Sequence, residues 1–195
     1  MKKKVFSLKG EYKKCFEYIS QSKKFIFLII GFFSFFFFIG LLVLPSEDLY
    51  NQIMKMLKEI LLETENLSLV ELIFYIIFNN LQSGLLGMLF GFIFGIFPLI
   101  ITVFNGYLLG FVSLMSINNE GLCSLWKLFP HGIFELPAIF ISLGLGLKFG
   151  TFVFQKEKIN SFWDYLLNSI RVFLFIIIPL LILAGVIEGI LIFLF

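Results

Sequence analysis

Residues 128–150 read LFPHGIFELPAIFISLGLGLKFG, a stretch that decides the fold because it is long and apolar enough to enter a membrane. It nevertheless holds the chain's only histidine, His131, and a carboxylate four residues later, Glu135. Residues four apart share one face of a helix. Pro130 suits the first turn of that helix, whereas Pro137 lies further in and is expected to bend it. Ionisable groups inside an apolar span are candidates for a functional site, because hydrocarbon makes them costly to bury.

The whole chain has the composition of an integral membrane protein. Of its 195 residues, 59% are hydrophobic, only 14% are charged and 29 are phenylalanine. A soluble domain of this length does not need so many apolar residues to form its core. Nothing in the sequence favours a nucleic-acid partner, and two cysteines make neither a disulfide framework nor a thiolate metal site. We predict an all-α fold, a polytopic membrane bundle of about five transmembrane helices with short amphipathic surface helices.

The apolar runs divide the chain into five predicted spans. These are residues 25–44, 69–95, 98–117, 128–149 and 172–195. Pro98 marks the division between the second and third spans, which leaves room only for a very tight turn. A re-entrant segment in place of one span is the main alternative.

Three segments outside the spans are predicted to be helical at the membrane surface. Residues 1–24 are basic, with apolar side chains at helical spacing, and are expected to lie on the cytoplasmic leaflet as a unit separate from the transmembrane domain, 25–195. Residues 46–67 should form an amphipathic helix with Ser46 as a possible N-cap. Residues 161–164 resemble a capping box that opens a further helix before the last span.

Charge asymmetry orients this bundle in the cell membrane. With the N-terminus in the cytoplasm, twelve basic residues lie on the cytoplasmic side and three outside. The three are Lys55, Lys58 and Lys127. The excess of Lys and Arg in cytoplasmic segments favours a cytoplasmic N-terminus and an external C-terminus.

Six polar residues of the apolar spans form the candidate functional cluster. They are Glu71, Asn80, Asn105, His131, Glu135 and Glu188. With a helical rise of ~1.5 Å per residue, Glu135 lies roughly 9 Å and Glu188 about 10 Å below the same external face. The cluster can be structural glue between helices, a pair of carboxylates that share a proton, a carboxylate paired with a His131 cation, or a ligand set for a metal such as zinc. The metal is least favoured because the spacing matches no zinc motif, so we expect neither a metal nor a cofactor.

Glycines four residues apart recur in every span but the first. They are Gly87, Gly91 and Gly95 in the second span, Gly106 and Gly110 in the third, Gly146 and Gly150 in the fourth, and Gly185 and Gly189 in the fifth. This spacing places small residues on one helical face and allows close backbone approach. We expect spans two to five to form the core, with the Phe-rich first span packed outside.

Three short motifs resemble the stage II sporulation protein M family of integral membrane proteins. They are PHGIFELPA at 130–138, NGYLLG at 105–110 and AGVIE at 184–188. The resemblance covers about residues 70 to 190, and His131, Glu135 and Glu188 match the family pattern. It implies a multi-helix membrane protein. In spore formers, the founding member helps to assemble a peptidoglycan-degrading complex during engulfment and is similar to a membrane anchor or scaffold.

Three functions follow as hypotheses. The first is a membrane scaffold that binds the lipid bilayer and recruits other membrane or envelope proteins, with a homo-oligomer left open. The second is a transporter or permease component with Asn105, His131, Glu135 and Glu188 lining a polar path. The third is an intramembrane hydrolase. It ranks last because the sequence has no serine nucleophile motif and no full metal signature, so no catalytic residue is assigned and an enzyme is not favoured.

Overall fold

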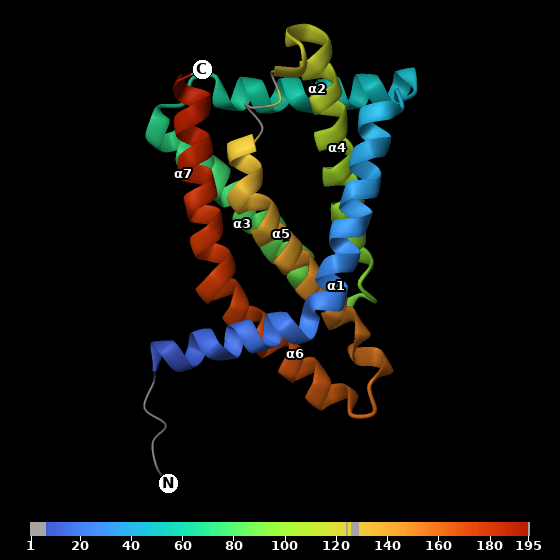
Figure 1. Ribbon diagram of the computed structural model, residues 1–195, viewed down its shortest axis with the longest axis vertical. Helices are drawn as coiled ribbons and strands as arrows, with labels where there is room; N and C mark the ends of the chain where they lie inside the picture. Colours follow the sequence, from blue (N-terminus) through green and yellow to red (C-terminus); the bar gives the residue numbers. More distant parts are fainter. Residues whose placement is uncertain (1–6, 124, 126–128, 195) are drawn as a thin grey trace.

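The computed structural model describes residues 7–123, 125 and 129–194, with residues 129–131 described by their backbone only. All regular structure in these residues is helical, which confirms the predicted all-α class (Figure 1). Seven α-helices follow one another in this described part of the chain. They are α1 (Leu8–Leu42), α2 (Glu47–Thr64), α3 (Leu69–Leu89), α4 (Ile96–Glu120), α5 (Phe129–Gly150), α6 (Lys158–Val172) and α7 (Ile178–Leu194). Among the residues described, five segments are long and apolar enough to cross a membrane, as predicted, and the chain is a multi-pass membrane protein.

Helix α1 joins the predicted basic segment and the predicted first span in one continuous helix of 35 residues. Figure 1 shows that its N-terminal part runs across the bundle and its C-terminal part runs along it. The hydroxyl of Ser22 donates to the carbonyl oxygen of Tyr18 at 2.7 Å, a back-bond that often bends helices. From Ser22 to Leu42 the helix rises about 30 Å, close to the hydrocarbon thickness of a bilayer. We call the crossing part, residues 8–22, the surface segment.

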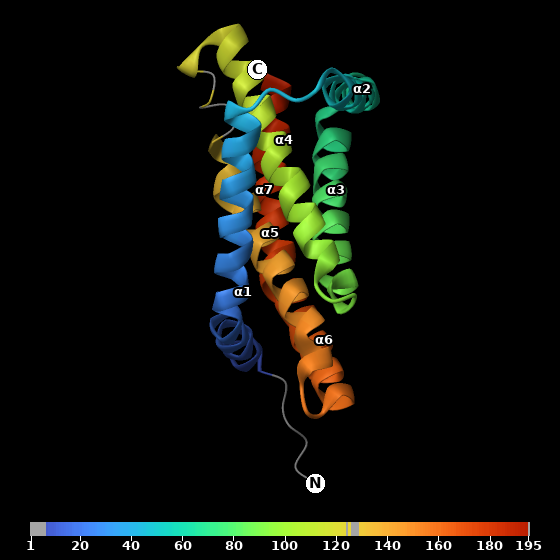
Figure 2. The same ribbon diagram turned by 90° about the vertical axis from the view of Figure 1, so that its right-hand side faces the viewer.

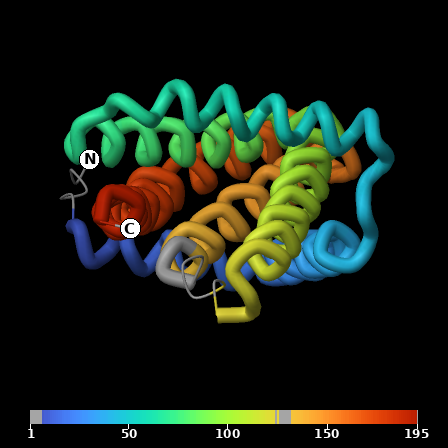
Figure 3. Tube along the Cα trace, turned by 90° about the horizontal axis from the view of Figure 1, so that it is seen from above, coloured from blue at the N-terminus to red at the C-terminus, as the bar shows by residue number. Residues whose placement is uncertain are grey.

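Helix α2 lies across the opposite end of the molecule, where Figure 2 shows it end on. The hydroxyl of Ser46 accepts from the Leu49 N–H at 3.4 Å, so the predicted N-cap is confirmed. One side of α2 faces the bundle, with Ile53 buried and the Tyr50 ring 5.9 Å from that of Phe111. Seen from above in Figure 3, α2 and the surface segment run along opposite long sides of the molecule. We call the end of the molecule that carries α2 the α2 face, and the end that carries the surface segment the N-terminal face.

The turn between α3 and α4 is as tight as the sequence predicts. After a short 3-10 segment, Phe90–Phe92, the chain reverses at Phe94 and Gly95, whose φ angles are 52° and 70°. A left-handed φ suits glycine and is rare for a residue with a side chain. Pro98 follows within the first turn of α4, where its missing N–H is tolerated.

Close glycine packing joins the helices, but not in the predicted grouping. A Cβ on Gly106 or Gly110 of α4 would overlap the backbone carbonyl of Phe33 or Phe37 in α1. Gly40 of α1 fits equally tightly against the Tyr107 carbonyl. The prediction that the first span packs outside the core is therefore wrong, because α4 makes its closest backbone contacts with α1.

The other glycine pairs join α3, α5 and α7. Gly146 meets the backbone at Gly87 and Gly91, and Gly150 meets it at Gly91 and Gly95. On α7, Gly185 and Gly189 face Ile77 and Ile73 of α3. The order of these contacts shows that α3 runs parallel to α5 and antiparallel to α7.

The last span is reached through α6, which continues into α7 through a π-helical segment, Phe173–Ile177. Pro179 lies just after this segment, and the wider turn accommodates a ring that would clash with the carbonyl four residues earlier. Helix α6 begins at Lys158 rather than Ser161, so the predicted capping box is wrong. Asn160 instead donates to the carboxylate of Glu157, the N-cap residue, at 2.8 Å.

Candidate functional site

Helix α5 is the centre of the bundle and carries the buried carboxylate of the candidate cluster. It contacts α1, α3, α4, α6 and α7. Glu135 is only 9% exposed, two turns before Ser142, whose hydroxyl donates to the Gly84 carbonyl of α3 at 2.8 Å. Pro137 lies between them, and α5 is one uninterrupted helix through it.

Asn80 of α3 lies at the level of Glu135. Gly84 meets Ile139 and Ser142, and Gly87 meets Leu143. Asn80 is one helical turn before Gly84. Because the two helices are parallel, Asn80 is level with the α5 residues one turn before 139–142, which are residues 135–138. The Asn80 amide nitrogen is buried and has no hydrogen-bond partner among the residues described.

Glu188 lies on α7, also in the half of the bundle nearer the α2 face. Gly185 and Gly189 on the same helix face Ile77 and Ile73, which places Glu188 within a turn of those α3 residues. The side chain is half-buried, and one carboxylate oxygen is inaccessible. About six residues along α3, or about 9 Å, separate its level from that of Asn80.

The remaining three candidates are placed differently. Glu71 accepts from the backbone N–H of Ser68 at 2.9 Å and from its hydroxyl at 2.6 Å, forming a capping box at the exposed start of α3. Asn105 is half-buried on α4, beside the glycine face that packs on α1. The backbone of His131 lies in the first turn of α5, and its side chain lies outside the described part of the structure.

The structure thus brings Asn80, Glu135 and Glu188 into one half of three adjacent helices. Carboxyl and amide groups there can exchange protons or hydrogen-bond a polar solute. A search of the described residues finds no group of three His, Cys, Asp or Glu side chains that could hold a metal ion. That the three residues act together stays a prediction.

Lys148 is a buried cation that sequence reasoning counted only as a flanking charge. It is 7% exposed, its ammonium donates to the Ser22 hydroxyl at 3.1 Å, and it lies 3.8 Å from the ring centroid of Tyr18. The ring centroid of Tyr165 is 5.3 Å away. The only sequence signal is a lysine inside an otherwise apolar run. The cation joins α1, α5 and α6 at the N-terminal face.

An ion pair secures the surface segment beside this cation. The Arg171 guanidinium lies 2.7 Å from the carboxylate of Glu11, which also pairs with Lys14. On the same segment Cys15 is fully buried. The Tyr12 ring packs edge to face on the Phe175 ring, with 5.8 Å between the ring centroids. The surface segment is therefore packed on α6 and the π-helical segment by specific contacts.

Comparisons with known proteins agree with this architecture. The sequence model described as stage II sporulation protein M matches residues 25–191. An uncharacterized protein of Methanocaldococcus jannaschii is 32% identical over an alignment of 124 residues that covers 57% of this chain and 51% of that protein. The chain thus spans about half the length of this curated relative. No solved structure matches. Because the family match covers most of the chain, including α3, α5 and α7, this protein belongs to the stage II sporulation protein M family.

Proposed function

We propose that this protein is a scaffold of the cell membrane that recruits a partner protein at its N-terminal face, which lies in the cytoplasm. The described basic residues support this orientation, because nine of them lie in the N-terminal part of α1, at the end of α5 or in the α6 hairpin, and two lie on α2. The resemblance to a family whose founding member helps to assemble a membrane complex supports the recruiting role.

The observation that carries the proposal is an uncovered apolar stripe on α6. Ile159, Trp163 and Leu167 are four residues apart and are 76%, 55% and 57% exposed. Figures 1 and 2 show that α5 and α6 meet beyond the surface segment, away from the bundle. The Tyr165 carbonyl accepts from Tyr18 of the surface segment, so the start of α6, which carries Ile159 about 9 Å before Tyr165, lies past that segment.

The hairpin that presents the stripe is rigid enough to be a binding platform. The Phe149 and Phe162 rings lie 5.0 Å apart, and the Phe152 ring packs edge to face on Phe162 at 5.2 Å. Lys156 and Lys158 are exposed at its tip. An apolar stripe beside two cations fits an amphipathic partner helix whose apolar face is flanked by acidic residues.

Site-specific photocrosslinking in membranes of the native host tests this proposal. A benzophenone amino acid in place of Trp163 should give one discrete protein adduct. The combined substitutions Lys156→Glu and Lys158→Glu should lower its yield several-fold, because they repel an acidic partner. The same probe in place of Phe74, which is 67% exposed within α3, is the matched control and should label lipid only.

Three results would count against recruitment. Lipid adducts alone at residue 163 would make the stripe a membrane anchor. An adduct with a second copy of the chain would make it an oligomer interface. A protein adduct that is insensitive to the charge reversal would contradict the acidic partner.

A second candidate function, a transporter or permease component, is favoured by the buried polar groups of Asn80, Glu135 and Glu188. Purified protein in liposomes should then conduct protons, measured with an internal pH dye under a potassium potential. Glu135→Gln and Glu188→Gln should abolish the flux without loss of folding, and Glu59→Gln on exposed α2 should not. Wild-type liposomes that are as tight as empty ones would exclude proton conduction, and unstable glutamine variants would indicate structural glue.

A further inference from the structure

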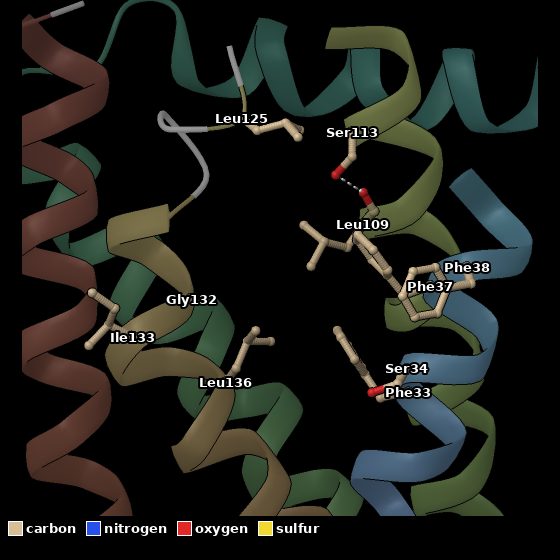
Figure 4. Close-up of a pocket in the computed structure, with 10 residues that line it drawn as sticks. All are labelled: Phe33, Ser34, Phe37, Phe38, Leu109, Ser113, Leu125, Gly132, Ile133 and Leu136. Carbon is tan, nitrogen blue, oxygen red and sulfur yellow. Dashed lines mark hydrogen bonds between the residues drawn. The ribbon is translucent and has the colours of Figure 1, made fainter. Parts of the chain in front are cut away.

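A cavity of about 480 Å³ lies between α1, α4 and α5, in the half of the bundle nearer the α2 face. Figure 4 shows Leu109 and Leu136 pointing toward it from opposite sides, with Leu125 above. Phe33 lies at its lower end. The volume is within the range of ordinary small-molecule sites, about 300–1,000 Å³.

The cavity follows from how the helices cross. Toward the N-terminal face α5 and α1 pack closely, with Gly144 against Ile26 and the rings of Phe33 and Phe140 5.0 Å apart. Toward the α2 face the two helices diverge, as Figure 1 shows, while α4 stays on α1 through Gly106 and Gly110. A wedge therefore opens above Phe33 that no described side chain fills.

The described lining offers little to a polar ligand. The two hydroxyl residues among the described lining residues are Ser34 and Ser113, and the Ser113 hydroxyl already donates to the Leu109 carbonyl at 2.7 Å. The rest of that lining is apolar or glycine, and none of it is charged. An ion or sugar would lose its hydration without replacement, and an apolar cavity of this kind does not hold water.

The position of the cavity among the spans favours a lipid over a protein segment. Because its walls belong to three membrane spans, the surrounding medium is acyl chain.

We infer that this cavity binds an acyl chain of a membrane lipid from the leaflet on the α2 side. The chain enters between α1 and α5 and ends near Phe33, about midway along the upright part of α1. The headgroup lies toward the α2 face. Filling the wedge restores the dispersion contacts that its lining lacks. One bound lipid is then a structural component that stabilises the angle between α5 and α1.

Lipid retention measures this directly. Protein purified in mild detergent and examined by native mass spectrometry should keep about one phospholipid per chain. Leu136→Trp fills the cavity and should lower that occupancy at least fivefold. Leu183→Trp, the same change at a 52% exposed position of α7, should leave it unchanged.

Ser34→Phe provides an independent variant. Ser34 is exposed on α1, so a phenylalanine there fills the cavity from the wall opposite Leu136. It should lower occupancy by a similar factor even where Leu136→Trp does not fold. Wild-type protein without bound phospholipid would overturn the inference, and so would a phospholipid that both cavity-filling variants retain. Retention of detergent alone, which phospholipid does not displace, would also overturn it.

Discussion

The ammonium of Lys148 lies 3.8 Å from the ring centroid of Tyr18, although the two residues are on different helices of the N-terminal face. Both are buried. A desolvated cation over an aromatic face is worth about 2 kcal/mol, compared with about 0.5–1 kcal/mol at an exposed site. This contact therefore helps to hold the surface segment at the bend of α1.

Tyr18→Leu should lower the free energy of unfolding by about 2 kcal/mol, because it removes the ring and leaves the buried cation poorly partnered. Tyr18→Phe should cost little, since the hydroxyl reaches the Tyr165 carbonyl only at 3.4 Å. Denaturant unfolding in micelles of these variants, alone and with Lys148→Met, gives the coupling energy. An equal Tyr18→Leu effect in both backgrounds would show that the ring merely packs.

The ion pair between Glu11 and Arg171 should control access to Cys15. Arg171→Ala removes this ion pair, so the surface segment should open several-fold more often. The labelling rate of Cys15 by a maleimide measures this, with exposed Cys123 as the reference thiol. Lys13→Ala is the control, because the Lys13–Glu17 pair is 3.8 Å long and exposed. Unchanged Cys15 labelling in Arg171→Ala would mean that packing alone holds the segment.

Glycine contacts predict opposite effects at two positions of α1. Gly31→Ala should be neutral or stabilising by about 0.5–1 kcal/mol, because nothing lies within 4 Å of the added carbon and alanine favours helix. Gly40→Ala should destabilise by about 1–3 kcal/mol, because the added carbon overlaps the Tyr107 carbonyl and must separate α1 from α4. The same unfolding assay compares them. A Gly40→Ala variant as stable as wild type would contradict the close α1–α4 contact.

The sequence predicts the spans because their apolar runs have the length that a bilayer requires. It also predicts features set by local chemistry, such as the Ser46 cap and a tight turn before Pro98. The glycine spacing shows which helix face is small, but not which helix will cover it. The spacing of Gly106 and Gly110 therefore could not identify α1 as the helix that packs on them.

Contacts between distant residues explain the other differences. The partners of Lys148 are Tyr18, Ser22 and Tyr165, which come from two other helices, so no local pattern marks the site. Asn80 and Glu135 are level only because Gly84 and Gly87 set the register of α3 on α5. At Ser161 the local motif is present, but the helix has already begun at Lys158. In the first two cases tertiary packing decides among arrangements that local chemistry leaves open.

The capping box at the start of α3 predicts a structural role for Glu71. Ser68→Ala should cost about 1 kcal/mol and increase hydrogen exchange of the amides at 69–72, because the helix start loses its hydroxyl acceptor. Glu71→Gln should have a smaller effect, since an amide oxygen still accepts from the Ser68 N–H. Hydrogen-exchange mass spectrometry of the peptide at 66–75 measures both, and exchange at 135–140 is the control. If Glu71→Gln instead altered exchange near Glu135 and left 69–72 protected, Glu71 would belong with the buried cluster rather than the cap.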